Sequence, residues 1–485
     1  MQLWTLLEHA AEHFGPRPAV LAAGQRFTWT ETWKRCIALA RGLSSEGTKP
    51  GDRILVQLEN GPAFFELTFA AAGIGAVLVP ASPQLNPHEL AALIERAQPA
   101  LHFRSDAQVE ETQRPGASAD WQPLHSDETQ LAQLYFTSGT TGEPKGVMLT
   151  HGNLVEHALA AIDEFRLGAQ DVWGHIAPMF HLADAWAIIA ITAAGGCHAF
   201  LPRFDGSAAL DLIEQAKVTI TNLVPTHLGR MLAARAPQSG PLPSMRLVLS
   251  GGAPIAPRTV RDILANLCPE YAQTYGMTET SPFLTLSLLR PEHRQLPLAT
   301  QLDIRCATGR PYQGIELQVV DSAGDPVPSD RQSVGEIRVR GKSVSPGYWN
   351  NPKATGENHR GGWLYTGDLA TVDAEGYVRI VDRAKDMILS GGENVYSIEV
   401  EKVLHEHPTV LEAAAYGVPS EEWGEEVRAA VVLREASPTP EDIEQVLRRF
   451  VAKHLSAFKV PKRILIRTSL PKTPSGKIRK ADLRA

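Results

Sequence analysis

The sequence contains few cysteines, and their spacing excludes two classes of protein. Across 485 residues the cysteines stand at four scattered positions, Cys36, Cys197, Cys268 and Cys306. No two of them form a CxxC pair or another paired spacing, so neither a disulfide framework nor a zinc site is indicated. This cysteine usage favours a reducing, cytoplasmic location.

Long apolar runs are also missing. The most apolar stretches, residues 64–80 and 185–201, are short or interrupted by polar residues. Since a membrane-spanning helix needs about 20 mostly apolar residues, both stretches predict buried core rather than a membrane span. The segment Met1–His9 lacks the basic region of a signal peptide and predicts an amphipathic helix.

An excess of positive charge is missing as well. Lysine and arginine number 47 against 54 aspartates and glutamates, which gives a net charge of -7. No broad attraction to nucleic acid is therefore expected. With 43% hydrophobic and 21% charged residues the whole chain should fold, and its length predicts roughly three domain-sized units.

The apolar pattern predicts an α/β protein with two domains. Up to about residue 300, short apolar runs alternate with segments of helical period, which indicates layered α/β subdomains around a largely parallel sheet with ligands at the carboxyl ends of its strands. Residues 303–381 predict a β-rich subdomain. We therefore expect a large N-terminal domain over 1–384 and a small, mobile α+β C-terminal domain over 385–485.

One loop points to a polyphosphate ligand. Residues 134–148 (LYFTSGTTGEPKGVM) read as a strand followed by a loop of small and hydroxylated residues with one lysine, Lys145. Such a loop lets backbone N–H groups approach an anion, while the lysine adds positive charge. Pro144 stands where a Walker motif requires its second glycine, so a P-loop phosphotransferase is disfavoured. A polar surface turn is the simpler alternative for the loop by itself.

This loop and four further motifs resemble those of the adenylate-forming superfamily, in its acyl-CoA synthetase branch. The further motifs follow in family order at 273–280 (QTYGMTET), 362–368 (GWLYTGD), 381–388 (VDRAKDMI) and 471–477 (PKTPSGK). The resemblance implies a two-step ligase. A carboxylic acid and ATP give an acyl-adenylate and pyrophosphate, and the thiol of coenzyme A then displaces AMP. ATP, Mg²⁺ and coenzyme A are the implied cofactors and substrates.

The resemblance also implies roles for individual residues. Lys477 is the catalytic lysine that reaches the attacking carboxylate and the α-phosphate; Thr278 bonds the α-phosphate; and Glu279 holds Mg²⁺. A positioned cation suits a step that brings two anions together. Asp368 and Arg383 contact the ribose, and Gln273 and the Gly251–Ala253 backbone border the adenine. The implied ATP or AMP set is Thr137, Ser138, Gly139, Thr140, Thr141, Gly142, Lys145, Gly252, Ala253, Gln273, Tyr275, Gly276, Thr278, Asp368, Arg383 and Lys477.

For the acid, the resemblance implies that His181, in the segment PMFHLADAW, lies beside the substrate carboxylate, although such a histidine can also be a satisfied core residue. The implied lining is neutral and mainly apolar. A second carboxylate would be buried there without a partner, so fatty or aryl monocarboxylic acids are expected and dicarboxylic acids are disfavoured. The implied pocket is Phe180, His181, Trp186, Asn222, Val224, Gly252, Gly276, Met277 and Phe283.

The acceptor of the second step is inferred from residues 390–401 (SGGENVYSIEVE), which resemble the loop of acyl-CoA ligases. Gly391 and Gly392 would flank the pantetheine arm, and Lys385 matches the hinge about which the C-terminal domain swings. An adenylating enzyme that passes the acyl group to an amine or a carrier-protein thiol is the alternative. A catalytically silent nucleotide-binding regulator is a further alternative, which the intact Thr278, Glu279, Asp368 and Lys477 set disfavours. The sequence is silent on the oligomeric state, and a homodimer is one option.

Overall fold

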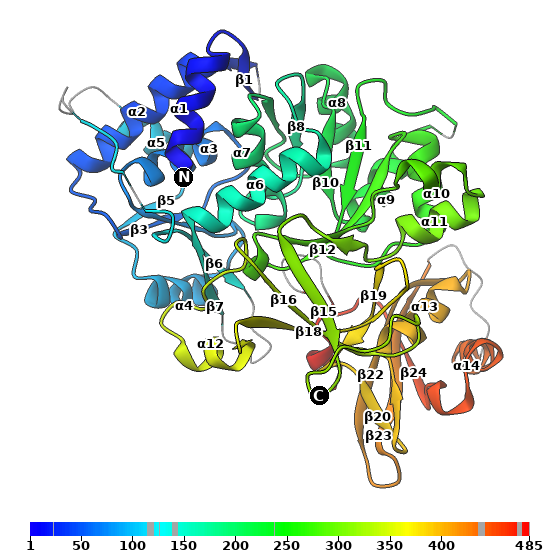
Figure 1. Cartoon of the computed structure of the whole chain (residues 1–485). Coiled ribbons are helices and arrows are strands. Elements are labelled where there is room, and N and C mark those ends of the chain that lie inside the picture. Colours follow the sequence, from blue (N-terminus) through cyan, green and yellow to red (C-terminus); the bar gives the residue numbers. More distant parts are fainter. Residues whose placement is uncertain are drawn as a thin grey trace. The chain divides into compact units, whose positions relative to one another are not determined.

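The computed structural model describes most of the chain (Figure 1). The described residues are 1–22, 24–113, 121–125, 127–137, 144–236, 238–434, 442–472 and 478–484. Within these ranges no helix is both long enough and apolar enough to cross a membrane. The fold divides into two compact units. The first comprises Met1–Leu317 with Val339–Leu364, and the second comprises Gln318–Arg338 with Tyr365–Ala485.

The first unit contains a large mixed sheet with the strand order β14-β13-β12-β11-β10-β8-β9-β1-β2. Its strands are β14 Arg310–Pro311, β13 Phe283–Leu286, β12 Tyr271–Gly276, β11 Leu247–Ser250, β10 Ile220–Leu223, β8 Val172–His175, β9 Cys197–Phe200, β1 Pro18–Ala22 and β2 Gln25–Thr28. The strands from β1 to β12 along this order pair in parallel, whereas the pairs at both ends are antiparallel.

A second sheet of the first unit has the order β5-β3-β4-β6-β7. Its strands are β5 Leu101–Phe103, β3 Arg53–Val56, β4 Val77–Pro80, β6 Leu131–Thr137 and β7 Lys145–Thr150. All pairs are parallel except the β6–β7 hairpin. The layered α/β arrangement of largely parallel strands that the sequence indicated is confirmed. The division of these strands between two sheets was not predicted, because apolar strand patterns identify strands but not their partners.

Helices cover both sheets, and local capping explains several of their starts. Thr28 and Glu31 form a capping box at α2, and Asn86 and Glu89 form another at α4. The two apolar stretches of the sequence lie in the buried helices α3 and α7 and the strands that follow them, which confirms the core prediction. The helices are α1 Leu3–Phe14, α2 Trp29–Ser45, α3 Pro62–Gly73, α4 Pro87–Ala97, α5 Asp106–Thr112, α6 His151–Phe165, α7 Leu182–Ala193, α8 Gly206–Ala216, α9 Pro225–Ala233, α10 Pro257–Asn266, α11 Leu298–Arg305 and α12 Pro352–Asn358.

A third sheet has the order β15-β16-β18-β17, with β19 also paired to β18. Its strands are β15 Ile315–Val320, β16 Gly335–Gly341, β17 His359–Arg360, β18 Trp363–Val372 and β19 Val378–Arg383. The division between the two units falls inside β15, β16 and β18. A domain boundary at residue 384 stays a prediction, since the two compact units divide at other positions, inside these strands.

The sheet that lies wholly in the second unit has the order β21-β20-β23-β22, with β24 parallel to β23. Val400, Leu404, Leu447 and Val451 of its two helices pack against this sheet and form the core of the unit. The elements are β20 Ile388–Ser390, β21 Glu393–Val395, α13 Ser397–Glu406, β22 Val410–Ser420, β23 Gly424–Leu433, α14 Ile443–His454 and β24 Arg463–Arg467. The α+β character expected of the C-terminal part is confirmed.

A buried ion pair joins α2 to α3. Glu66 is 1% exposed, and it accepts hydrogen bonds from Arg35 Nε at 2.5 Å and from Gln113 Nε2 at 2.5 Å. Burial raises the pKa of Glu66, while Arg35 and Gln113 act to lower it. The carboxylate therefore depends on these donors, because an unpaired buried charge is costly.

We expect Arg35→Met to lower the free energy of unfolding by about 3 kcal/mol at pH 7.5, because it leaves Glu66 buried without its cation. Loss of Arg35 raises the pKa of Glu66 further, so the folded variant binds a proton more tightly than the unfolded chain. Its stability deficit should therefore shrink as the pH falls towards 5. Urea unfolding followed by tryptophan fluorescence measures both effects.

Arg203→Met is the matched control, since Arg203 pairs with Glu59 at 2.7 Å but its side chain is 77% exposed. We expect it to cost less than about 1 kcal/mol at either pH. Equal losses in the two variants would contradict the role given to the Arg35–Glu66 pair.

Candidate functional site

The phosphate loop expected from the sequence connects the two strands of the β6–β7 hairpin. Thr137 ends β6, Lys145 begins β7, and the two residues are cross-strand partners. The Thr137 hydroxyl donates to the Lys145 carbonyl at 3.4 Å. The loop residues Ser138–Gly142 lie outside the described residues. The hairpin thus places a hydroxyl and a lysine at the two ends of the loop.

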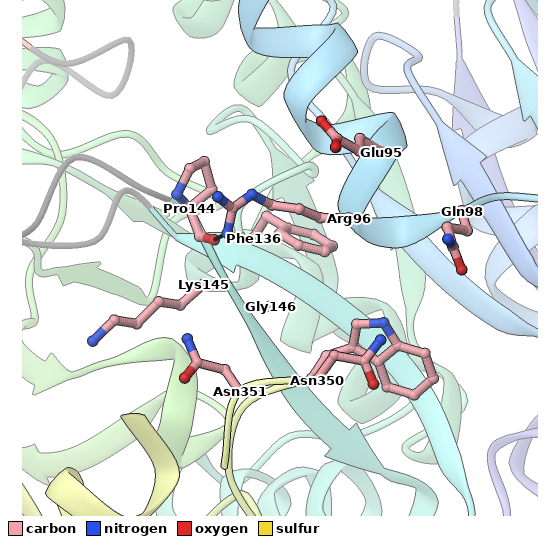
Figure 2. Close-up of a pocket in the computed structure, with 10 residues that line it drawn as sticks. Glu95, Arg96, Gln98, Phe136, Pro144, Lys145, Gly146, Asn350 and Asn351 are labelled. Carbon is pink, nitrogen blue, oxygen red and sulfur yellow. Dashed lines mark hydrogen bonds between the residues drawn. The ribbon is translucent and has the colours of Figure 1, made fainter. Parts of the chain in front are cut away.

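A polar pocket adjoins the start of β7 (Figure 2). Arg96 of α4 donates to the Pro144 carbonyl at 3.2 Å, so the helix holds the chain where it enters β7. On the opposite side of β7, Met148 N–H donates to the Gly347 carbonyl at 3.0 Å and Trp349 N–H donates to the Gly146 carbonyl at 2.7 Å. These bonds fix the direction of the hairpin from both sides.

Tyr348 links the hairpin to Glu279, the expected magnesium ligand. Its hydroxyl donates to Glu279 Oε1 at 2.7 Å, and Lys145 Nζ lies 5.4 Å from the centre of its ring. Burial raises the pKa of Tyr348, and the Glu279 carboxylate raises it further, so the hydroxyl remains a donor at neutral pH. Glu279 is 6% exposed. Sequence reasoning missed Tyr348. The Gly-Tyr-Trp sequence at 347–349, directly before the turn at 350, was the feature that could have drawn attention to it.

The turn that carries Thr278 and Glu279 is built on tight backbone contacts. It forms a short 3₁₀ helix, Thr278–Thr280, between β12 and β13. A Cβ on Gly276 would lie 1.9 Å from the Pro282 carbonyl oxygen, so only glycine fits this position. The Met277 N–H donates to the same oxygen at 3.0 Å. Thr278 is half-buried beside the buried Glu279, so the turn can present a hydroxyl and a carboxylate together.

The residues expected to border the adenine are brought together at the carboxyl ends of β11 and β12. Gln273 Nε2 donates to the Ala253 carbonyl at 2.9 Å, and the Tyr271 hydroxyl donates to Gln273 Oε1 at 2.5 Å. Gly252 has φ of +80°, which glycine adopts without strain. Tyr275, at the end of β12, is half-buried. The carboxyl edge of parallel strands is where α/β sheets bind ligands.

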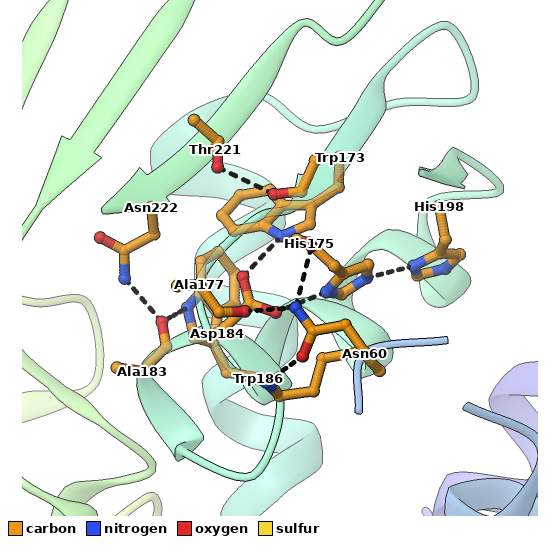
Figure 3. Close-up of polar contacts among 12 residues, drawn as sticks. Asn60, Trp173, His175, Ala177, Ala183, Asp184, Trp186, His198, Thr221 and Asn222 are labelled. Carbon is orange, nitrogen blue, oxygen red and sulfur yellow. Dashed lines mark hydrogen bonds and ion pairs between the residues drawn. The ribbon is translucent and has the colours of Figure 1, made fainter. Parts of the chain in front are cut away.

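Two of the expected acid-binding residues, Trp186 and Asn222, meet at the first turn of α7 (Figure 3). His181 precedes α7, is half-buried, and lies beside Phe180 with ring centres 4.6 Å apart. The Ala183 carbonyl accepts from Asn222 Nδ2 at 2.6 Å and from Trp186 Nε1 at 3.1 Å. His181 is therefore not fully buried in the core, as expected of a residue whose side chain faces a ligand.

Trp186 and Phe283 lie in a close-packed aromatic cluster. Their ring centres are 5.1 Å apart, and Trp186 packs edge to face on Trp173 at 4.9 Å. Both side chains are almost fully buried, as is His157, whose Nε2 accepts from the Phe283 N–H at 3.3 Å. The two residues therefore form a rigid apolar wall. Val224 and Met277 of the expected pocket are half-buried, and Val224 lies closest to the position that a Cβ on Gly252 would occupy.

A series of buried, hydrogen-bonded side chains supports the first turn of α7 next to this wall. His175 Nδ1 lies 2.6 Å from Asp184 Oδ2, and the Trp173 Nε1 donates to Asp184 Oδ1 at 3.3 Å. His175 Nε2 lies 3.0 Å from His198 Nδ1. Burial lowers the pKa of His198 well below its usual value, so this ring is neutral. Asn60 donates to the carbonyls of His175 and Ala177 at 3.0 and 2.8 Å. The first turn of α7 is therefore held by satisfied polar contacts.

In the second unit, the two residues expected at the ribose form an ion pair. Asp368 and Arg383 are cross-strand partners on β18 and β19, and Arg383 Nε lies 2.9 Å from Asp368 Oδ1. Asp368 is buried, whereas the Arg383 side chain is 48% exposed. The Thr366 hydroxyl accepts from the Asp368 N–H at 3.1 Å and so fixes the backbone there. The structure brings this expected pair together.

Gly391 and Gly392 are the two central residues of the β20–β21 hairpin turn. Ser390 pairs with Glu393, and the glycines have φ of +60° and +83°. Positive φ at both positions is the geometry of a type I′ turn, which favours glycine. A Cβ on Gly391 would lie 3.0 Å from the Trp423 ring, whereas one on Gly392 would have no atom within 4 Å. The geometry of the turn is therefore a structural reason for both glycines, in addition to their expected role beside the pantetheine arm.

The expected hinge and catalytic lysines lie near the two ends of the expected C-terminal domain, residues 385–485. Burial lowers the pKa of Lys385, and Arg484 Nη2 donates to the Lys385 carbonyl at 3.4 Å. Lys477 lies outside the described residues. The chain on either side of it is fixed, because Lys472 and Ile478 form a β-bridge. Beyond that bridge, Lys480 Nζ bonds the Ser397 hydroxyl at 2.6 Å and Glu401 Oε1 at 2.7 Å.

Comparison with known proteins places this arrangement in a family. A family model described as AMP-binding enzyme matches residues 7–349, and one described as AMP-binding enzyme C-terminal domain matches residues 399–477. The chain is 36% identical to a feruloyl-CoA synthase of Amycolatopsis, over 96% of this chain and 95% of that protein. It is 34% identical to the fatty acid–[acyl-carrier-protein] ligase ScoC of Streptomyces coeruleorubidus, over 100% and 96%.

A solved structure extends the match to the fold. The o-succinylbenzoate coenzyme A synthetase of Bacillus subtilis, in complex with ATP and a magnesium ion, has a TM-score of 0.88 and 27% identity, with 100% of both chains covered. The mixed α/β fold class expected from the sequence is thereby confirmed. Because the first family model covers well over half of the chain and relatives above 30% identity align with nearly all of it, the chain belongs to the AMP-binding enzyme family, and the resemblance to adenylate-forming acyl-CoA synthetases is confirmed.

Proposed function

We propose that the chain is an acid–CoA ligase that converts a monocarboxylic acid, ATP and coenzyme A into an acyl-CoA, AMP and pyrophosphate. The observation that carries this proposal is the link from the phosphate hairpin through Tyr348 to Glu279. It holds a lysine and a buried carboxylate on one scaffold. Such a pair suits a nucleoside triphosphate with its magnesium ion, and the matched relatives support the acyl-CoA product.

In the first step the acid carboxylate attacks the α-phosphate and pyrophosphate leaves. Thr278 donates to the α-phosphate, and Lys145 faces the departing phosphates from the start of β7. Lys477 supplies positive charge between the two reacting anions. Glu279, held by Tyr348, provides one carboxylate ligand for Mg²⁺, which usually takes one or two carboxylates and otherwise phosphate and water oxygens. The metal neutralises phosphate charge.

The acid pocket suits an apolar or aryl acid. The aromatic wall of Trp186 and Phe283 offers van der Waals contact, and His181 faces the carboxylate end. The lining adds no lysine or arginine for a second carboxylate, so dicarboxylic acids stay disfavoured. A feruloyl-CoA synthase and a fatty acid ligase among the relatives support aryl and fatty acids alike.

The second unit serves the nucleotide and then the thiol. Asp368 accepts hydrogen bonds from the ribose hydroxyls, with Arg383 beside it. After adenylation the C-terminal domain, over residues 385–485, swings about Lys385, withdraws Lys477 and brings the Gly391–Gly392 turn to the pantetheine arm. A cytoplasmic location and a homodimer remain predictions.

A carrier-protein thiol is the second candidate acceptor, because ScoC is named for transfer to an acyl-carrier protein. Pyrophosphate exchange over a panel of fatty and aryl acids tests the first step. Mass spectrometry of reactions with coenzyme A, a phosphopantetheinyl carrier protein or an amine then identifies the acceptor. We expect acyl-CoA as the product. If exchange occurs but no acyl-CoA forms, the compound that is acylated instead is the acceptor. If no acid supports exchange, the proposed activity is refuted.

We expect Lys477→Ala to lower adenylation about 10²- to 10³-fold while sparing the thiol step, because the lysine acts as one preorganised charge in the first step only. Pyrophosphate exchange measures the first step. Acyl-CoA formation from synthetic acyl-adenylate measures the second. Lys453→Ala, which removes an exposed lysine of α14 in the same unit, is the control and should leave both rates within a few-fold. If Lys477→Ala lowered the rates of both steps equally, Lys477 would instead be assigned a structural role or a role in ATP binding generally.

We expect Glu279→Gln to lower magnesium-dependent adenylation about 10²-fold and Tyr348→Phe to raise the Mg²⁺ concentration for half-maximal rate about tenfold. The phenylalanine keeps the ring beside Lys145 and removes only the hydroxyl that orients Glu279. Exchange rates titrated with MgCl₂ and Mg²⁺-dependent ATP binding by calorimetry report both changes. Tyr312→Phe is the control, since Tyr312 also buries its hydroxyl, on the His157 carbonyl at 3.0 Å. The same magnesium shift in the control would contradict the role of Tyr348.

We expect Gly392→Leu to leave pyrophosphate exchange within about twofold and to block thioester formation, because a bulky side chain would fill the proposed pantetheine path. The positive φ of Gly392 strains any L-residue, so Gly392→Asn is the matched variant. Asparagine adopts this conformation more readily and should lower thioester formation less. Losses that are alike in both half-reactions, or alike for leucine and asparagine, would assign the effect to the turn itself.

A further inference from the structure

Asn222 is a buried polar residue in an otherwise apolar wall. It lies on β10 at the carboxyl edge of the large sheet and is 5% exposed. Successive strand residues point to opposite faces. Leu223 packs into the core formed with α8, α9 and α10, whereas Asn222 contacts α7. Its amide thus faces the aromatic side of the sheet, where Trp186 lies.

The orientation of the Asn222 amide is fixed by its partner. Nδ2 donates to the Ala183 carbonyl at 2.6 Å, and a carbonyl can only accept. The same carbonyl accepts from Trp186 Nε1 at 3.1 Å. Rotating the amide by half a turn would place two oxygens against each other, so the NH₂ group stays on Ala183. Figure 3 shows Oδ1 pointing away from this carbonyl.

The amide oxygen is left with an unused acceptor. Among the described residues, no donor lies within hydrogen-bonding distance of Asn222 Oδ1, although the atom is buried. A buried acceptor without a partner costs roughly 1–3 kcal/mol. The neighbouring Thr221 shows the usual outcome, since its buried hydroxyl donates to the Gly174 carbonyl at 2.8 Å. Within the described part of the chain, nothing therefore supplies a donor to the Asn222 oxygen.

We propose that Asn222 Oδ1 accepts a hydrogen bond from a hydroxyl or amino group on the acid substrate. The inference rests on the proposed function, because it assigns Asn222 to the acid pocket. The enzyme then prefers acids with such a donor over the same acids without it. A pocket with a committed acceptor discriminates strongly, since an acid that lacks the donor leaves the acceptor unpaired on binding.

The experiment compares matched acids. Pyrophosphate-release kinetics on the full chain give kcat/KM for benzoate against its three monohydroxy isomers, cinnamate against 4-hydroxycinnamate, and hexanoate against 6-hydroxyhexanoate. The expected result is at least one hydroxy acid favoured about tenfold or more over its parent acid. In Asn222→Leu that ratio should fall close to one, mainly through loss of activity with the hydroxy acid. Asn222→Ala repeats the test should the leucine variant fail to fold.

Thr221→Val is the matched control, because it removes a buried hydrogen bond from the same strand on the other face. It should lower the melting temperature and leave the ratio unchanged. A wild-type ratio near one for every pair would overturn the inference, as would a ratio that Asn222→Leu and Asn222→Ala both preserve; an internal water would then satisfy Oδ1. No activation of these acids or of any other fatty or aryl acid would instead refute the proposed function, and the inference with it.

Discussion

The hydrogen bond between the Tyr348 hydroxyl and Glu279 is the contact on which the arrangement of the expected phosphate-binding residues of the first unit depends. It joins a turn after β12 to a segment that pairs with β7, about seventy residues further along the chain. Without it a buried carboxylate would have to keep its position by packing alone. With it, the β6–β7 hairpin and the Glu279 carboxylate share one rigid support, which suits the proposed binding of ATP and Mg²⁺.

The expected acid-binding residues near α7 are also held by buried hydrogen bonds, which other side chains provide. Asp184, His175 and His198 satisfy one another in a chain behind α7, so the first turn of that helix is held without exposing polar atoms. Next to this support, the buried oxygen of Asn222 is one of a few atoms, with His157 Nδ1 among them, that have no hydrogen-bond partner among the described residues. Rigid, satisfied surroundings are the condition under which one orphan acceptor can set substrate preference.

The second unit stabilises its functional segments through short connections at their ends. Lys480 binds Ser397 and Glu401, and Lys472 binds Glu412 at 2.5 Å. These contacts fix the chain on both sides of residues 473–477. Burial raises the pKa of Glu401, which Lys480 opposes, so the anchor is an ion pair largely removed from water.

The amino-acid sequence by itself determined the family, the α/β class, most helices and strands, and the identity of the chemical groups in the motifs. These properties are local: capping residues, apolar period and short ordered motifs are features of neighbouring residues, and the apolar stretches 64–80 and 185–201 coincide with α3, α7 and the strands that follow them. The second parallel sheet, the Tyr348–Glu279 bond and the unpaired oxygen of Asn222 were decided only by the tertiary structure. Each depends on which distant residue comes to lie beside another, and periodicity or motif spacing holds no record of such pairing.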